Sequence, residues 1–248
     1  MSPEVPRLDF PTLIPAFFVR RDNRFRTQVS LKGEEIAAYL PNPGRLEELL
    51  EPGRKVLLRP APASSRSSRR TGYDLLLIEA GDVWVSLDSR LPNPLMERML
   101  RGGWFSAFEA YPEIQREVRL GRSVIDFRLD GAEPSSTLPS EQPCWIEVKS
   151  VTLVEEEGTA AFPDAPTKRG RRHVRELQAA VREGARAAVV FVVQREDAAR
   201  FAPHDATDPE FGEALREAVA AGVETYAVRC RVTPEGIWPL DTLPVVLR

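Results

Sequence analysis

The sequence is poor in lysine, histidine and cysteine, and the shortages of histidine and cysteine exclude several classes of site. Only four of its 34 Lys and Arg residues are lysines, and His173 and His204 are the only histidines. A zinc site with two histidines on one helix is therefore excluded, as is a histidine-rich catalytic cluster. The two cysteines, Cys144 and Cys230, lie far apart in the chain and indicate neither a disulfide scaffold nor a four-cysteine zinc site.

Long apolar segments are also missing. The longest apolar run, residues 187–193, is far shorter than the ~20 residues that a membrane helix needs. The first ten residues, MSPEVPRLDF, lack the apolar stretch of a secretory signal peptide. No G-x-S-x-G, P-loop or dinucleotide fingerprint is present, so hydrolase, NTPase and dehydrogenase functions based on them have no support. We therefore expect a cytoplasmic protein.

The net charge of −3 is small, but the charges are unevenly distributed along the chain. A charge near zero argues against binding of polyanions by the whole surface. Residues 168–186 nevertheless hold seven basic residues and only two acidic ones. On a predicted helix, Lys168, Arg171 and Arg175 fall on one face, where they would contact a nucleic-acid backbone. The alternative is an ordinary solvated face of the helix.

The first third of the chain contains short segments rich in β-branched and aromatic residues, which predict strands. These segments are residues 25–31, 35–40, 55–59, 73–79 and 83–87. One short helix is predicted over residues 45–50, after a turn with the sequence PNPG. Five strands and one helix within residues 1–88 favour a small, partly open β-barrel of the OB type, with a β-sandwich as the alternative.

Arginine and phenylalanine are interleaved at the start of this domain. The residues concerned are Phe17, Phe18, Arg20, Arg21, Arg24, Phe25 and Arg26. Basic side chains among aromatic rings are typical of a nucleic-acid-binding face, and we assign Arg20 and Arg24 to such contacts. The alternative places the phenylalanines in the barrel core. The Pro- and Ser-rich segment 60–71 is either a flexible surface loop or a source of phosphate contacts through Arg66, Arg69 and Arg70.

After residue 88 the pattern changes to that of an α/β fold. Helices are predicted over residues 93–101, 168–183 and 209–221, and strands over residues 114–120, 123–129, 145–151, 187–193 and 225–232. Asn93 is predicted to cap the first helix. The strand at residues 187–193 is wholly apolar, so we expect both of its faces to be buried. Residues 89–248 are thus predicted to form a second domain, a mixed sheet flanked by helices.

Two predicted strands of this domain bring acidic residues and a lysine together. Because side chains alternate along a strand, Asp126 on one strand can meet Glu147 on the next, with Lys149 on the same face as Glu147. An acid on one strand followed by acid, apolar residue and lysine on the next resembles the layout of the PD-(D/E)XK nucleases. The alternative is a half-exposed strand with ordinary charged residues, but an unpaired Asp126 in an otherwise apolar strand would be costly to desolvate.

The oxygen ligands of this arrangement favour a hard divalent cation, Mg²⁺ or Mn²⁺. Asp126 and Glu147 are the predicted metal ligands, and Lys149 would position the attacking water or the scissile phosphate. Glu97, on the helix that precedes these strands, is a candidate for an additional metal ligand. The alternative for Glu97 is a solvated helix residue.

Several segments together resemble the sugar fermentation stimulation protein A (SfsA) family. They are RFRTQVSLKGEEIAAYLPNPGRLEELLEPG, VIDFRL, WIEVKSVTL, FPDAPTKRGRRHVREL, VVFVVQREDAARFAPHDATDP and AGVETYAVRCRVTPEGI. The resemblance implies an N-terminal OB-like domain, a C-terminal PD-(D/E)XK-like domain and DNA binding without marked sequence preference. It also implies a link to the regulation of sugar metabolism, notably that of maltose. The nuclease-like acids and lysine of the family correspond to Asp126, Glu147 and Lys149.

The sequence therefore predicts a DNA-binding protein with a Mg²⁺-type phosphodiesterase site in its C-terminal domain. One alternative is a regulatory DNA-binding protein that keeps the nuclease fold without cleaving DNA. A weaker alternative is a structural or sugar-linked role in which DNA binding is incidental. The oligomeric state is left open.

Overall fold

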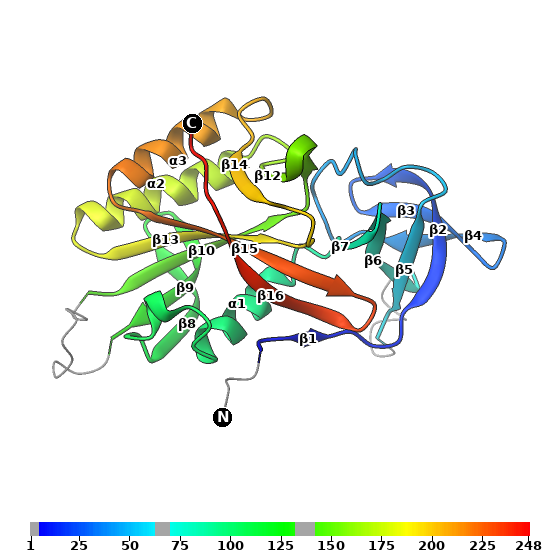
Figure 1. Cartoon of the computed structure of the whole chain (residues 1–248), viewed down its shortest axis with the longest axis horizontal. Helices are drawn as coiled ribbons and strands as arrows, with labels where there is room; N and C mark the ends of the chain where they lie inside the picture. The colour runs from blue at the N-terminus through cyan, green and yellow to red at the C-terminus, as the bar shows by residue number, and fades with distance from the viewer. Residues whose placement is uncertain (1–4, 63–69, 132–141) are drawn as a thin grey trace.

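The computed structural model describes residues 5–62, 70–131 and 142–248. Their strands form three sheets, of six, seven and three strands. Figure 1 shows the strands of the six-stranded sheet as a barrel on the right, and the seven-stranded sheet with its helices on the left. The predicted combination of a small barrel and a helix-flanked mixed sheet is confirmed.

The N-terminal barrel closes by a pairing between strands that are distant in sequence. Its strands are β2 (Ile14–Asn23), β3 (Arg26–Leu31), β4 (Glu34–Tyr39), β5 (Lys55–Pro60), β6 (Tyr73–Ala80) and β7 (Val83–Ser86). They follow the order β4-β3-β2-β5-β6-β7, and a parallel pairing between Tyr39 and Asp74 joins β4 to β6. The barrel is therefore closed by five strands, with β7 added at its edge, and is not partly open as predicted.

Two local features of this domain differ from the sequence prediction. Strand β2 was not predicted, because proline at its second position and the run RRDN at its end resemble a loop. The predicted helix at residues 45–50 is absent, and these residues form a hydrogen-bonded turn. Leu46 has a φ of 56°, which is incompatible with a right-handed helix, and its N–H donates to Asp164 in the other domain at 3.1 Å.

The seven-stranded sheet carries the predicted helices on its two faces. It has the order β1-β16-β15-β13-β10-β9-β8. The central strands β10 (Cys144–Val151), β13 (Arg186–Val193) and β15 (Glu224–Thr233) are parallel, whereas the outer strands β8 (Glu113–Leu120), β9 (Ser123–Asp130) and β16 (Gly236–Leu243) pair in antiparallel fashion. Among the described residues, no helix is long and apolar enough to cross a membrane.

The apolar strand β13 holds the two layers of this domain together. On one face, Val190 and Val192 pack in the cluster that contains the buried residues of α1 (Pro92–Arg101). On the other face, Val189 and Phe191 pack beneath α2 (Lys168–Arg182) and α3 (Pro209–Ala220). Burial of both faces is thus confirmed, and Figure 1 shows α2 and α3 together on one side of the sheet.

The first strand departs from the predicted division at residue 88. Strand β1 (Leu8–Asp9) pairs with Ile237 and Gly236 of β16, so it belongs to the sheet of the C-terminal domain. A small separate sheet, made of β11 (Val154–Glu155), β12 (Thr159–Phe162) and β14 (Arg200–Pro203), leads into the loop that carries Asp164. This loop faces the PNPG turn of the barrel.

Gly44 allows the two domains to approach closely at this loop. A Cβ atom at Gly44 would overlap the carboxylate of Asp164, which is held by the N–H of Leu46. By contrast, a Cβ atom at Gly72 would meet nothing within 4 Å. A side chain at position 44 would thus have to displace the Asp164 carboxylate from the domain junction.

We expect Gly44→Ala to lower the free energy of unfolding by about 1–3 kcal/mol, because Asp164 must move and release Leu46. Gly72→Ala is the matched control and should be neutral or slightly stabilising. Urea denaturation of both variants measures the difference. Equal stability of the two variants would show that the junction is not tightly packed at Gly44.

Candidate functional site

The structure brings the three predicted residues Asp126, Glu147 and Lys149 together. Strands β9 and β10 are antiparallel, and the pairing of Phe127 with Ile146 places Asp126 next to Glu147. The Asp126 carboxylate accepts a hydrogen bond from the backbone N–H of Val148 at 2.8 Å. Lys149 Nζ donates to Glu147 Oε1 at 2.5 Å. The predicted cluster therefore exists as a set of neighbouring, interacting groups.

The two carboxylates have opposite electrostatic properties. Burial first and the neighbouring charge of Glu147 second raise the pKa of Asp126. Burial also acts to raise the pKa of Glu147, but Lys149 and His173 outweigh it, and this pKa is lowered. Because Glu147 is only 3% exposed, its charge depends on these two partners. The site thus favours an ionised Glu147 beside an Asp126 that ionises less readily.

His173 is a site residue that sequence analysis missed. Its Nδ1 is hydrogen-bonded to Glu147 Oε1, and its Nε2 accepts from Arg169 Nε at 3.2 Å. Since Nε2 accepts, the proton of a neutral His173 lies on Nδ1 and is donated to Glu147. A weak signal exists in the sequence: His173 lies four residues before the buried Leu177 of α2, on the face turned toward the sheet.

Asn93 is a second site residue with a role that was not predicted. The expected N-cap role is wrong, because α1 begins at Pro92 and Leu91 is at the cap position. The Asn93 side chain instead donates to Asp126 Oδ1 at 2.7 Å. Both oxygens of Asp126 therefore accept a hydrogen bond, one from α1 and one from β10.

The structure does not bring Glu97 to the two carboxylates. Glu97 lies one helical turn after Asn93, and its side chain forms ion pairs at 3.0 Å with Arg101 and with Arg116 of β8. Within residues 5–62, 70–131 and 142–248, no three His, Cys, Asp or Glu side chains form a metal-binding group. The expected additional ligand is thus turned toward arginines, because the helix presents this position to β8.

One carboxylate oxygen is left available in the buried site. Glu147 Oε2 is buried and has no hydrogen-bond partner among the described residues. An unpaired buried carboxylate oxygen is unfavourable, and a cation beside it would remove this cost. Asp126 and Glu147 offer oxygen ligands only, which are the ligands that Mg²⁺ and Mn²⁺ prefer. The residues present therefore fit a divalent cation bound between these two side chains.

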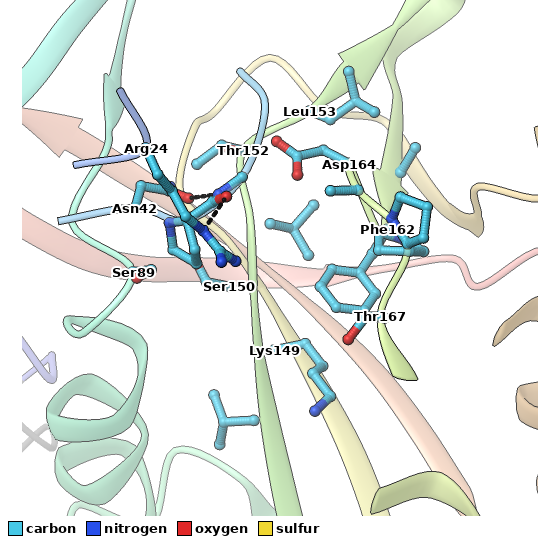
Figure 2. Close-up of a pocket in the computed structure, with 18 residues that line it drawn as sticks. Arg24, Asn42, Ser89, Lys149, Ser150, Thr152, Leu153, Phe162, Asp164 and Thr167 are labelled. Atoms are coloured by element: carbon cyan, nitrogen blue, oxygen red, sulfur yellow. Dashed lines mark hydrogen bonds between the residues drawn. The ribbon is translucent and has the colours of Figure 1, made fainter. Parts of the chain in front are cut away.

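A pocket at the domain junction leads to Lys149. The barrel contributes Arg24 and the turn Asn42, Pro43 and Gly44, and the C-terminal domain contributes the end of β10 and residues 161–167. Figure 2 shows Arg24 and Asn42 on one side of this pocket and Asp164 and Phe162 on the other, with Lys149 below them. We call this space the junction pocket.

Helix α2 begins at the edge of the junction pocket. Thr167 lines the pocket and caps the helix by accepting a hydrogen bond from Gly170 N–H at 2.9 Å. The N-terminal end of a helix has a partial positive charge, which attracts anions. The fold thus directs a positive helix end and the Lys149 amine toward the same pocket.

The predicted basic residues differ in how free their charges are. Lys168 and Arg175 are exposed, and no ion pair with a described acidic residue is found for either. Arg171 is 13% exposed and pairs with Glu210 and, at 3.9 Å, with Asp208. Of the predicted face, Lys168 and Arg175 are therefore the residues with available charge.

The two predicted barrel arginines also differ. Arg20 pairs with Asp22 at 3.3 Å and with Glu35 at 2.5 Å, so its charge is offset locally. Arg24 donates from Nε to the carbonyl of Pro43 at 3.3 Å and lines the junction pocket. Only Arg24 is thus connected to the candidate site. Arg66 and Arg69 lie outside the described residues.

As pH rises from about 4 to neutral, we expect Asp126→Asn to gain free energy of unfolding relative to the wild-type protein. The amide NH₂ group that then faces one of the two donors adds a cost that does not depend on pH. The pKa of Asp126 is raised in the folded protein, so its ionised form is less favourable there than in the unfolded chain. This cost grows as pH rises from the ordinary aspartate pKa of about 4 toward the raised value, and it is constant above that value. The stabilisation should therefore shrink as pH is lowered to about 4.

Urea denaturation at several pH values measures this effect. Asp130→Asn, at the end of the same strand, is the control, because Asp130 forms an ordinary ion pair with Arg128 at 2.8 Å. A stability of Asp126→Asn, relative to the wild-type protein, that does not rise between a pH of about 4 and neutral pH would contradict the electrostatic description of the site.

Comparisons with known proteins agree with this arrangement of two domains. Residues 19–87 match the SfsA N-terminal OB domain, and residues 90–236 match the sugar fermentation stimulation protein RE domain. The chain is 50% identical over 222 residues to the sugar fermentation stimulation protein homolog of Moorella thermoacetica, covering 90% of this chain and 91% of that protein. It is 44% identical to the homolog of Desulforamulus reducens, covering 96% of this chain and 94% of that protein.

A solved structure has the same fold over nearly the whole chain. Pyrococcus furiosus SfsA in complex with Ca²⁺ matches with a TM-score of 0.85 and 31% identity, covering 98% of this chain and 99% of that one. The resemblance predicted from sequence is thus confirmed, and the chain belongs to the sugar fermentation stimulation protein (SfsA) family.

Proposed function

We propose that the protein binds DNA without marked sequence preference and hydrolyses phosphodiester bonds at a divalent-metal site formed by Asp126 and Glu147. The observation that carries this proposal is the buried Glu147 Oε2, which has no hydrogen-bond partner among the described residues and lies beside a second carboxylate. The Ca²⁺ in the complex of Pyrococcus furiosus SfsA supports a site for a hard divalent cation in this family.

The residues of the site have distinct roles in this proposal. A divalent cation, when bound, neutralises charge on the phosphate and lowers the pKa of a coordinated water. Asp126 and Glu147 hold the cation, and Asn93 and His173 fix the orientation of these two carboxylates through hydrogen bonds. Lys149, which is 8% exposed and lines the junction pocket, orients the scissile phosphate or the attacking water.

The surroundings of the site suit a DNA backbone. The N-terminal end of α2 and the amine of Lys149, which is paired with Glu147, lie at the junction pocket, where Asp164 also lines the wall. Lys168 and Arg175, which are exposed and form no ion pair with a described acidic residue, add positive charge along α2. Contacts to phosphates without contacts to base edges give affinity without sequence preference.

A regulatory role without cleavage is the second candidate function. Lys149 is already hydrogen-bonded to Glu147 at 2.5 Å, so Glu147 has a cationic partner even without a metal ion. Such a site is stable as a purely structural ion pair within a DNA-binding protein. Relatives of this chain are named for stimulation of sugar fermentation, and in this proposal DNA binding serves the regulation of sugar metabolism.

Cleavage assays separate the two candidate functions. With linear and single-stranded DNA and Mg²⁺ or Mn²⁺, we expect Glu147→Gln and Lys149→Ala to reduce cleavage by about 100-fold or more, because each change removes a group that stabilises the transition state. Asp130→Asn, a change to an acid on the same sheet outside the site, should retain the wild-type rate. EDTA should abolish cleavage in the wild-type protein.

Intact DNA in all of these reactions, for the wild-type protein as for the variants, would exclude catalysis and favour the regulatory role. Binding of Mn²⁺, measured by calorimetry, then tests the metal site separately. Loss of Mn²⁺ binding in Glu147→Gln but not in Asp130→Asn is the expected result.

The salt dependence of DNA binding tests the basic face of α2. We expect Lys168→Ala and Arg175→Ala each to reduce the slope of log affinity against log salt concentration by about 1, because each removes one phosphate contact. Arg101→Ala, on the helix at the opposite face of the sheet, is the control for loss of one positive charge. Equal slopes for the wild-type protein and these three variants would show that α2 does not contact DNA.

A further inference from the structure

A second hollow lies on the barrel, next to the junction pocket. It is formed by the β2–β3 hairpin, the end of β4, and residues from the two segments that follow β5 and β7. Its lining residues are Asn23, Phe25, Arg26, Tyr39, Arg70, Thr71 and Arg90. It combines two aromatic rings with three arginines, a composition that suits a ligand with a flat apolar group and a negative charge.

The ring of Phe25 is exposed although its backbone is firmly held. Phe25 is 42% exposed, whereas Phe18 on the preceding strand is only 2% exposed. The Phe25 N–H donates to Asn23 Oδ1 at 3.0 Å, and the Phe25 carbonyl accepts from Leu40 N–H at 3.0 Å. The hairpin therefore fixes the position of a ring that does not contribute to the barrel core.

Tyr39 lies beside Phe25 in a nearly parallel orientation. The two ring centroids are 6.2 Å apart, and the angle between the ring planes is 29°. Tyr39 ends β4, opposite Arg26 on β3, so the regular pairing of these strands sets its position. Two nearly parallel rings, one on the β2–β3 hairpin and one at the end of β4, provide a surface on which planar groups can stack.

Positive charge surrounds these rings. The guanidinium carbon of Arg24 lies 5.5 Å from the centre of the Phe25 ring. Arg70 is exposed, and no ion pair with a described acidic residue is found for it. Arg90 is bound to Asp88 at 2.7 Å, and its guanidinium carbon lies 5.9 Å from the centre of the Tyr39 ring. Arg24 and Arg70 are thus available to an anionic group bound beside the rings.

The hollow and the junction pocket adjoin each other along the chain. Arg24 lines the junction pocket while Phe25 lines the hollow, and the same holds for Ser89 and Arg90. A ligand that extends from the Phe25 ring past Arg24 therefore reaches the pocket that contains Lys149. A polymer of linked anionic units fits this path better than a small molecule does.

We propose that the hollow is a stacking site for an unpaired nucleobase of single-stranded DNA, whose backbone continues past Arg24 into the junction pocket. Base-paired DNA cannot occupy this site, because its bases are stacked inside the duplex and do not expose a free face. The stacking site stands on the Phe25 hairpin alone, and only the continuation toward Lys149 rests on the proposed function. The protein therefore prefers single-stranded ends, gaps or flaps over continuous duplex.

Binding of a fluorescent single strand tests this site without any metal. The probe is a 12-nucleotide strand that contains 2-aminopurine, titrated in EDTA together with a duplex of equal length. We expect Phe25→Ala to weaken single-strand affinity by about tenfold and to abolish the fluorescence quenching that stacking causes, and Phe25→Trp to retain both. Phe17→Ala is the matched control, because Phe17 is 55% exposed on β2 and does not line the hollow.

The outcomes distinguish this site from the metal site. Equal single-strand affinities for Phe25→Ala and Phe17→Ala, with unfolding curves like that of the wild-type protein, would overturn the stacking site. The stacking site would also be overturned if the wild-type protein bound the duplex more tightly than the single strand. Glu147→Gln should bind the single strand in EDTA like the wild-type protein, so an absence of nuclease activity leaves this test unaffected.

Discussion

A buried carboxylate needs hydrogen-bond donors around it. The carboxylate of Glu147 receives such donors from both a strand and a helix, so it links the packing of these two elements. Strand β10 supplies Lys149, and helix α2 supplies His173, which in turn is held by Arg169. These partners occupy one oxygen of Glu147, and the other has no hydrogen-bond partner in the part of the chain that the structure describes. The helix–sheet packing around β13 therefore serves two purposes: it buries apolar side chains, and it keeps an available carboxylate oxygen at a defined position.

Sequence periodicity was sufficient to predict the part of the site that lies on strands. Alternation along β9 and β10 placed Asp126 near Glu147, because side chains repeat every two residues on paired strands. Asn93 and His173 could not be assigned in the same way. Their roles depend on how two helices cross the sheet, and short sequence patterns contain little information about this crossing. The same limit applies to Glu97, which was correctly placed on a helix but faces Arg116 instead of the carboxylates.

For the fold, too, local sequence patterns predicted some elements, whereas features that depend on distant residues were missed. Strands with clear β-branched runs and the amphipathic helix α2 were predicted within a few residues of their observed bounds. Strand β2 was missed, because its proline and charged residues are tolerated only in the context of the barrel. The turn at Leu46 depends on Asp164, which lies 118 residues further along the chain. Contacts between residues so far apart in the chain determine how the two domains meet. Such contacts cannot be recognised from a short stretch of sequence.

The short strand β1 has a mechanical consequence for the whole molecule. Because Leu8 pairs with Ile237, the barrel is inserted between two segments of one sheet and is anchored at both of its ends. A domain on a single linker can rotate freely, whereas a doubly tethered domain retains only limited hinge motion about the line between its two attachment points. The distance between the rings on the barrel and the amine of Lys149 is therefore restricted by chain connectivity, in addition to the contacts at the junction.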